Sequence, residues 1–346
     1  MHFLRLSLLL AVTALVTPGF CQAPASLPAN LASLDGHALR TPAADAKSLE
    51  RLTAYLTKPY GSEPEKVRSM YAWIVNNIRY DHRLAAHPKR KKVSPKTILK
   101  TRRAVCAGYA DLFVAMCRLA GIESEVVTGY SRHYNFNQKQ PFTRADHAWN
   151  AVQLDGQWYL LDATWESKRY GETGSRIESD YFLTDPGVFV TDHLPEDPAW
   201  QLLPCPISLR DFTRDVPAIR GTLSRRDTCF SYPDSIAALR RMLPPERELK
   251  TARTAHQFNP ANHVSIGLAL NNYGTYVAKP GAGSPKTGVG FKINKQQEAL
   301  GYYAEALRHL RKTDRKDFVH TCRKNSRAAR ATIKRLKKYR RKAPNA

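Results

Sequence analysis

Three residues of types that act together in thiol catalysis occur within one stretch of the sequence: Cys106, His147 and Asp162. Cys106 directly precedes a run whose apolar residues recur every three or four positions, which is typical of a helix with one buried face. Unpaired amides and the positive end of the helix dipole favour an anion at such a helix start. We therefore expect a nucleophilic thiolate at Cys106 near neutral pH. A small buried hydrophobic residue is the alternative for this cysteine taken alone.

A β-hairpin is expected to carry the other two residues. Asp155-Gly156 stands between two strand-like runs, and this dipeptide is typical of a two-residue type I′ turn. The turn pairs Leu154 with Gln157 and, counting back, places His147 on the same face as Asp162, roughly 7 Å away between backbones. The carboxylate can then orient the imidazole, so that the three residues supply nucleophile, base and orienter. Asp146 is the weaker candidate because adjacent strand residues point to opposite faces.

Further elements must position these groups. Residues 45–56 and 63–78 are predicted to be helices, the second one starting at a capping serine, Ser62, followed by Pro64 and two acids. Gly121 is expected to end the helix that follows Cys106, and a strand over residues 125–130 comes next. Helices are thus expected to bring the cysteine against an antiparallel sheet.

The block from about 65 to 165 resembles the transglutaminase-like superfamily. The resemblance is carried by Cys106 with Gly108 and Tyr109, and by the segments 121–130, 147–150 and 161–165. A further segment, 180–203, resembles the kyphoscoliosis-peptidase-like branch of that superfamily. The resemblance implies an α+β fold with a papain-like core, in which a helix carrying the cysteine packs on an antiparallel sheet carrying His and Asp. It covers roughly half of the chain.

Aromatic residues near the three candidates are expected to contribute to the site. We predict Tyr109, Trp149 and Trp165 as substrate-binding residues, although the tryptophans can equally be core or groove wall. The backbone amide of Cys106 is one expected oxyanion donor. A second donor stays unassigned, because Lys100 stands where a papain-type enzyme has its glutamine.

The resulting hypothesis is an acyl-transfer enzyme. Cys106 would attack an amide or peptide carbonyl, and the thioester would be resolved by water, as in a peptidase or amidase, or by an amine, as in transamidation. The alternative is a noncatalytic module that binds a peptide or a partner protein in the same groove. Members of this superfamily often lack one residue of the triad, and here all three are present.

The first 23 residues have the pattern of a secretory signal peptide. Arg5 precedes an apolar run of eleven residues, which is too short to span a bilayer comfortably. Cleavage after Ala23 is expected, and a lipoprotein anchor at Cys21 is the competing interpretation, weakened by Phe20. The mature chain is expected to be soluble and exported: periplasmic, secreted or associated with an envelope. Residues 24–44 are expected to be a flexible lead-in.

Removal of Cys21 leaves five cysteines, an odd number that suits one reactive thiol. Cys106 and Cys117 cannot bridge, since eleven helical residues separate them by about 16 Å. Pairing among Cys205, Cys229 and Cys322 cannot be derived from the sequence. No spacing of Cys and His is typical of a zinc site, so neither a metal nor a cofactor is expected. His256 and His263 are interpreted as ordinary polar residues.

The composition changes near residue 205, where we place the end of a catalytic domain over 45–204. Residues 205–346 are predicted to be mainly helical, ending in a hairpin of helices that turns near Thr313. The formal net charge is +24, and residues 301–346 hold sixteen Lys or Arg against three acids. These charges either solvate the outer face of the last helices or bind an anionic envelope or membrane surface; no specific nucleic-acid partner is expected.

Overall fold

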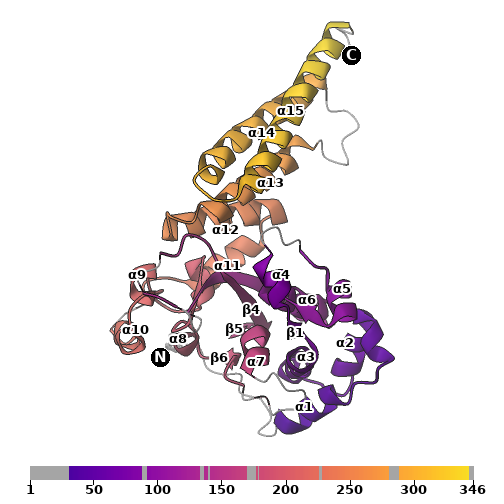
Figure 1. Cartoon of the computed structure of the whole chain (residues 1–346), viewed down its shortest axis with the longest axis vertical. Coiled ribbons are helices and arrows are strands. Elements are labelled where there is room, and N and C mark those ends of the chain that lie inside the picture. The colour runs from indigo at the N-terminus through magenta and orange to yellow at the C-terminus, as the bar shows by residue number, and fades with distance from the viewer. Residues whose placement is uncertain are drawn as a thin grey trace, which may run out of the picture.

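A five-stranded antiparallel sheet lies at the centre of the part of the chain before the last helices (Figure 1). The computed structural model describes residues 31–87, 92–132, 136–138, 141–169, 177, 179–225, 228–279 and 288–342. The strand order is β6-β5-β4-β3-β7. Their bounds are β3 (Ser124–Ser131), β4 (His147–Leu154), β5 (Gln157–Leu161), β6 (Phe182–Thr184) and β7 (His193–Pro195).

The central hairpin has the predicted register. Leu154 pairs with Gln157 and Asn150 with Leu161, around a turn in which Asp155 and Gly156 both have positive φ. Positive φ at both residues is typical of the type I′ turn that Asp-Gly favours. This turn fixes the register of the two strands, and the register determines which side chains share a face. Residues 149 and 151 face one hydrophobic cluster, whereas 152 and 154 face another, so both faces of the sheet are buried.

Helices from the first half of the chain cover one face of the sheet. The helix α6 (Cys106–Leu119) lies against β4 and β3, and its buried residues join a large core. The other elements on this side are α1 (Leu31–Leu39), η1 (Asp45–Lys47), α2 (Leu49–Thr57), α3 (Glu63–Asn77), β1 (Arg79–Tyr80), α4 (His82–Ala86), α5 (Pro95–Thr101), β2 (Arg103–Ala104) and α7 (Ala163–Arg169). The expected α+β core, with the cysteine helix packed on an antiparallel sheet, is confirmed.

The expectation of a flexible lead-in over 24–44 is wrong for its second part. Residues 24–30 lie outside the described ranges, but Leu31–Leu39 form α1, which packs on α3. Leu34 and Ala38 are buried there, and Asp35 accepts two hydrogen bonds from the fully buried guanidinium of Arg68, at 2.7 and 2.6 Å. A buried cation needs such a partner, so this segment belongs to the fold.

The segment after β6 covers the opposite face of the sheet. It forms α8 (Pro186–Phe189), η2 (Pro198–Gln201), α9 (Leu209–Phe212), α10 (Val216–Leu223) and α11 (Tyr232–Arg240). Ile236 and Phe189 pack with Trp149 and Trp158, while Phe212 and Ile219 pack with Tyr130 and Leu194. A disulfide joins Cys205 to Cys229 within this layer. The domain boundary near 205 stays a prediction, and residues on both sides of it share these two clusters.

The last four helices form an arm that leads away from the sheet (Figure 1). They are α12 (Pro244–Phe258), α13 (His263–Ala278), α14 (Val289–Leu310) and α15 (Lys316–Lys342). Their own core contains Leu270, Tyr303, Leu310 and Cys322. The predicted terminal hairpin turns between α14 and α15, as expected near Thr313. Within the ranges described above, no helix is long and apolar enough to cross a lipid bilayer.

Candidate active site

Cys106 is the first residue of α6, so its backbone amide has no acceptor within the helix. The short parallel pair β1–β2 fixes the chain just before it: Asp81 N–H donates to the carbonyl of Ala104 at 2.8 Å. Gly108 lets this end of the helix approach its neighbours, since a Cβ there would lie 2.9 Å from the Ala104 side chain and 3.0 Å from that of Ile98. Cys106 is 7% exposed, and its thiol is hydrogen-bonded to His147 of β4.

His147 and Asp162 meet at the open end of the β4–β5 hairpin. His147 Nε2–H donates to Asp162 Oδ2 at 2.8 Å, and both side chains are buried. The other oxygen, Oδ1, accepts from the backbone N–H of Thr164 at 2.7 Å. The backbone N–H of Asp162 itself donates to the Tyr181 carbonyl at 2.8 Å. The carboxylate is thus held at both ends, and it fixes the orientation of the imidazole that it accepts from.

The electrostatics favour a thiolate–imidazolium pair. Burial alone would raise the pKa of the Cys106 thiol, but the hydrogen bond and positive charge of His147 outweigh it, and the pKa is lowered. Burial would lower the pKa of His147, but the charge of Asp162 and its hydrogen bond raise that pKa to about 10. Asp162 itself keeps a pKa below its ordinary value despite burial, because His147 and His193 stabilise its charged form.

The structure brings a fourth residue, His193, to the same carboxylate. His193 begins the edge strand β7, is fully buried, and has Nε2 3.2 Å from Asp162 Oδ2. Its Nδ1 lies 2.6 Å from Asp192 Oδ1, so each ring nitrogen faces one carboxylate. The ring is also packed against Trp165 and Phe189, with centroids 4.3 Å apart in both cases. This histidine lies in the segment 180–203 that resembles the kyphoscoliosis-peptidase-like branch, and no local sequence pattern predicts its contact with Asp162.

Asp146 faces away from the imidazole, as the alternation of strand residues predicts. Its Oδ1 accepts from the backbone N–H of Ser131 at 2.8 Å and from the Ser131 hydroxyl at 3.1 Å. It therefore fastens the end of β3 beside the start of β4.

The predicted substrate-binding aromatics differ in exposure. Tyr109 and Trp149 are each 1% exposed, so they present no surface to a substrate in this structure. The Tyr109 hydroxyl donates to the Ile78 carbonyl at 2.6 Å, which ties α6 to α3. Trp149 lies over Gly129, where an added Cβ would be 2.5 Å from the indole. Trp165 is half-buried beside His147, with ring centroids 5.5 Å apart, and its role in substrate binding stays a prediction.

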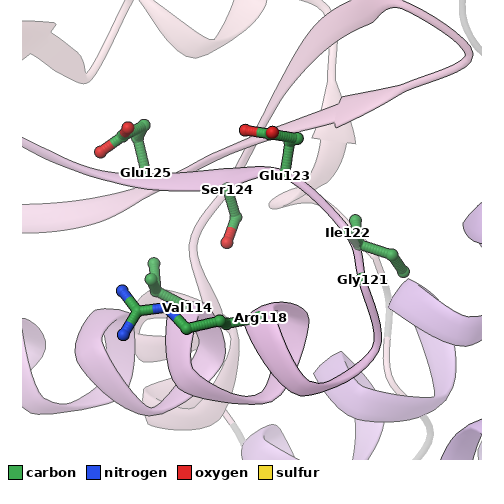
Figure 2. A pocket seen from close by; sticks show the side chains of 7 residues that line it. All are labelled: Val114, Arg118, Gly121, Ile122, Glu123, Ser124 and Glu125. Atoms are coloured by element: carbon green, nitrogen blue, oxygen red, sulfur yellow. The ribbon is translucent and has the colours of Figure 1, made fainter. Parts of the chain in front are cut away.

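Two cavities open near α6. One, of about 360 Å³, lies between the last turns of α6 and the start of β3, lined by Val114, Arg118 and Glu125 among others (Figure 2). Arg118 is twelve residues beyond Cys106, so this cavity is about 18 Å along the helix from the thiol. The other, of about 670 Å³, is lined by Asp81, Arg83, Leu84, His87 and Arg103, beside the strand that leads into Cys106. Neither cavity has Cys106, His147 or Asp162 among its lining residues.

Comparison with known proteins agrees with this geometry. Residues 49–163 match the transglutaminase-like superfamily. The chain carries a transglutaminase-like domain. The resemblance stated from the sequence is thereby confirmed.

Kyphoscoliosis peptidases are among the relatives of this chain. The Mus musculus protein is 41% identical over 169 residues, and the Homo sapiens protein is 41% identical over 177 residues. These matches cover 47% and 49% of this chain but only 26% and 27% of the relatives. Hillarin of Drosophila melanogaster is 28% identical over 224 residues, covering 59% of this chain and 26% of hillarin. The chain thus matches about a quarter of each relative's length.

Proposed function

We propose that this chain is a thiol enzyme of acyl-transfer type that acts on amide bonds of a peptide or protein. The contact between His147 Nε2 and Asp162 Oδ2, 2.8 Å, with the Cys106 thiol hydrogen-bonded to the same imidazole, carries the proposal. This is the nucleophile, base and orienter of thiol catalysis in one buried cluster. The peptidase names of two relatives support it.

In the first half-reaction, Cys106 Sγ forms a bond to the carbonyl carbon of the scissile amide. The oxygen becomes an oxyanion facing the amide of Cys106 at the start of α6. As the carbon–nitrogen bond breaks, the imidazolium of His147 gives its proton to the leaving amine. A thioester on Cys106 and a neutral His147 remain, with Asp162 still holding the ring in place.

In the second half-reaction, His147 takes a proton from the incoming nucleophile, which then displaces the thiolate. Water gives hydrolysis, and a primary amine gives transamidation. The relatives named peptidases favour hydrolysis. Incubating the protein with a peptide mixture and a fluorescent primary amine distinguishes the two, because only transamidation leaves the fluorophore attached to peptide.

The proposal predicts that Cys106 is alkylated faster than the other cysteines, and at lower pH than an ordinary thiol. The pKa of Cys117 is raised by burial to about 12 and that of Cys322 to about 11, while Cys205 and Cys229 are joined in a disulfide. Iodoacetamide should therefore label Cys106 first, with a rate midpoint below the ordinary thiol pKa of about 8.5. Peptide mapping by mass spectrometry after labelling at several pH values measures both quantities.

The same two groups should give turnover a bell-shaped pH profile. The acidic limb follows loss of the thiolate, and the basic limb follows loss of the His147 proton as pH rises toward about 10. In His147→Ala, the labelling midpoint should move up toward that of a free thiol. Slow, unselective labelling of the wild type, or an unchanged midpoint in His147→Ala, would favour the noncatalytic peptide-binding module instead.

We further propose that the chain is exported and that its basic C-terminal helix holds it on an anionic envelope or membrane surface. The disulfide between Cys205 and Cys229 supports export, because such bonds persist in oxidising compartments. The predicted signal peptide, with the competing anchor at Cys21, lies outside the described residues. Along α15, Cys322 and Ala329 are buried, whereas the cations within residues 334–341 are exposed.

Charge removal at the exposed end of α15 should weaken binding to anionic vesicles. We expect Lys334, Lys337, Lys338 and Arg340 changed together to Gln to bind vesicles rich in phosphatidylserine up to roughly 10³-fold more weakly at low salt, since each cation contributes about 1 kcal/mol at such a surface. Vesicle cosedimentation over a range of salt concentrations measures this. Substitution is preferable to deletion because Cys322 and Ala329 are core residues.

A matched variant removes the same number of charges elsewhere. Four exposed lysines lie outside the arm, in or directly after η1, α2 and α5: Lys47, Lys58, Lys96 and Lys100. Their change to Gln should leave vesicle binding nearly unchanged. Equal loss in both variants would mean that net charge alone, and not the helix, governs binding.

A further inference from the structure

Three histidines from three helices converge on one point of the C-terminal arm. His256 lies in the last turn of α12, His263 begins α13, and His309 lies in the last turn of α14. One ligand nitrogen from each ring lies within 4.8 Å of the other two, and all three residues are half-buried. The Nδ1 atoms of His263 and His309 are 3.1 Å apart.

The spacing of the rings is that of three imidazoles around one small metal ion. The ring centroids are 5.2, 4.8 and 5.3 Å apart, which makes a nearly equilateral triangle. Tetrahedral ligation with metal–nitrogen bonds of about 2.0–2.1 Å places imidazole centroids about 5 Å apart and ligand nitrogens about 3.3 Å apart. Small side-chain rotations would therefore complete a site with three protein ligands and an open fourth position.

The backbone around the cluster is built to hold it. Gly267, one turn beyond His263, lets α14 come close, because an added Cβ there would be 2.7 Å from the Leu310 side chain. In the turn between α12 and α13, Asn262 Oδ1 caps α13, accepting from the Ser265 N–H. Two buried amides, those of Asn259 and Asn262, donate to the Tyr130 hydroxyl at 2.8 and 3.2 Å. The ligand-bearing turn is thus fixed to β3 of the catalytic core.

His256 already has the second hydrogen bond that a metal-binding histidine makes, from the ring nitrogen that does not face the ion. His256 Nδ1 lies 3.1 Å from the Asn262 carbonyl oxygen, to which it can donate, and this leaves Nε2 free of its proton for an ion. Arg308 and Lys312 are the cations near His309. Burial first, and then nearby cations such as these, lower the pKa of His309 and favour its neutral ring, the form that binds a metal, although the same cations also disfavour a metal ion.

We propose that His256, His263 and His309 form a binding site for a divalent transition-metal ion, with Zn²⁺ as the occupant that three imidazoles and an open fourth position fit best. The ion ties the ends of α12, α13 and α14 together. This site is independent of the amide chemistry at Cys106.

The ion would also stiffen the connection between the arm and the active-site sheet. Glu196, which follows β7, accepts hydrogen bonds from the Asn262 amide and from the Ser265 hydroxyl, the latter at 2.6 Å. Its other oxygen accepts from Thr128 on β3 at 2.6 Å. A bound ion should therefore protect both the arm and this junction from hydrogen exchange.

The test is calorimetric titration of Zn²⁺ into the metal-free chain at pH 7, in a Cys106→Ala background that removes the competing thiolate. We expect one ion per chain. His263→Ala and His309→Gln should each weaken binding by more than the roughly 10–100-fold that loss of an outer-shell partner costs. His320→Ala, which removes an exposed histidine of α15, is the matched control and should bind normally.

A second measurement covers folding of the variants. Each variant should keep the wild-type unfolding temperature without metal, and only the chains that bind should gain stability with Zn²⁺. Unchanged affinity in His309→Gln would overturn the proposal. So would loss of the bound ion in His193→Gln, because the ion would then lie among His147, Asp162 and His193, whose ligand atoms are also within 4.8 Å of one another.

Discussion

Replacing Cys106 with alanine is expected to lower turnover of a peptide substrate by on the order of 10⁴-fold or more while leaving the fold intact. The thiolate is the atom that forms the bond to carbon, and no other side chain can replace it at the start of α6. His147→Ala should cost a similar factor, because it removes both the proton donor and the charge that keeps the thiol ionised. Hydrolysis of quenched fluorescent peptides measures both losses.

Cys117→Ala is the matched control, since this cysteine lies on the same helix and is fully buried. Its thiol has a pKa raised to about 12 and no catalytic partner is proposed for it, so turnover should stay near that of the wild type. The double variant of Cys106 and His147 should be hardly worse than either single variant, because the two residues act as a unit. Additive losses would mean that they act in separate steps.

Local patterns predicted the part of the site that local structure determines. The Asp155-Gly156 turn fixes the pairing of β4 with β5, and this pairing alone places His147 beside Asp162. The start of α6 follows from its periodicity and places Cys106 at a helix N-terminus. The strand pairing and the helix start each involve residues close together in the sequence. Both can be predicted because strands repeat every two residues and helices about every 3.6.

Non-local pairing determines what the sequence did not show. His193 reaches Asp162 because β7 pairs with β3, across the sheet from β5, and no local pattern specifies that neighbour. His263 and His309 are 46 positions apart in the sequence and meet only because α13 packs against α14. Their spacing therefore resembles no short metal-binding motif. Aromatic positions raise a related difficulty, since periodicity cannot tell whether Trp149 lies under the site or lines it.

Asp162→Asn is expected to lower turnover by about 10²–10⁴-fold without unfolding the protein. Three donors point at this carboxylate: His147 Nε2–H at 2.8 Å, Thr164 N–H at 2.7 Å, and His193 Nε2 at 3.2 Å. An asparagine offers one oxygen and one NH₂ group, so its NH₂ must face either the Thr164 amide or the two histidines. In both cases a donor meets a donor, and when the NH₂ group faces the histidines the imidazole of His147 also loses its acceptor and its fixed orientation. In either case the negative charge is lost.

The pH profile separates this effect from a loss of stability. Without the negative charge of Asp162, the pKa of His147 should fall from about 10, so the basic limb of turnover should move to lower pH. His193→Gln keeps one donor for the carboxylate and should cost less, about 10-fold, because His193 positions Asp162 and touches no reacting atom. His193→Phe removes that donor, so more of the Asp162 charge acts on His147, and the basic limb should move to higher pH. An unshifted profile in Asp162→Asn would show that another group orients His147.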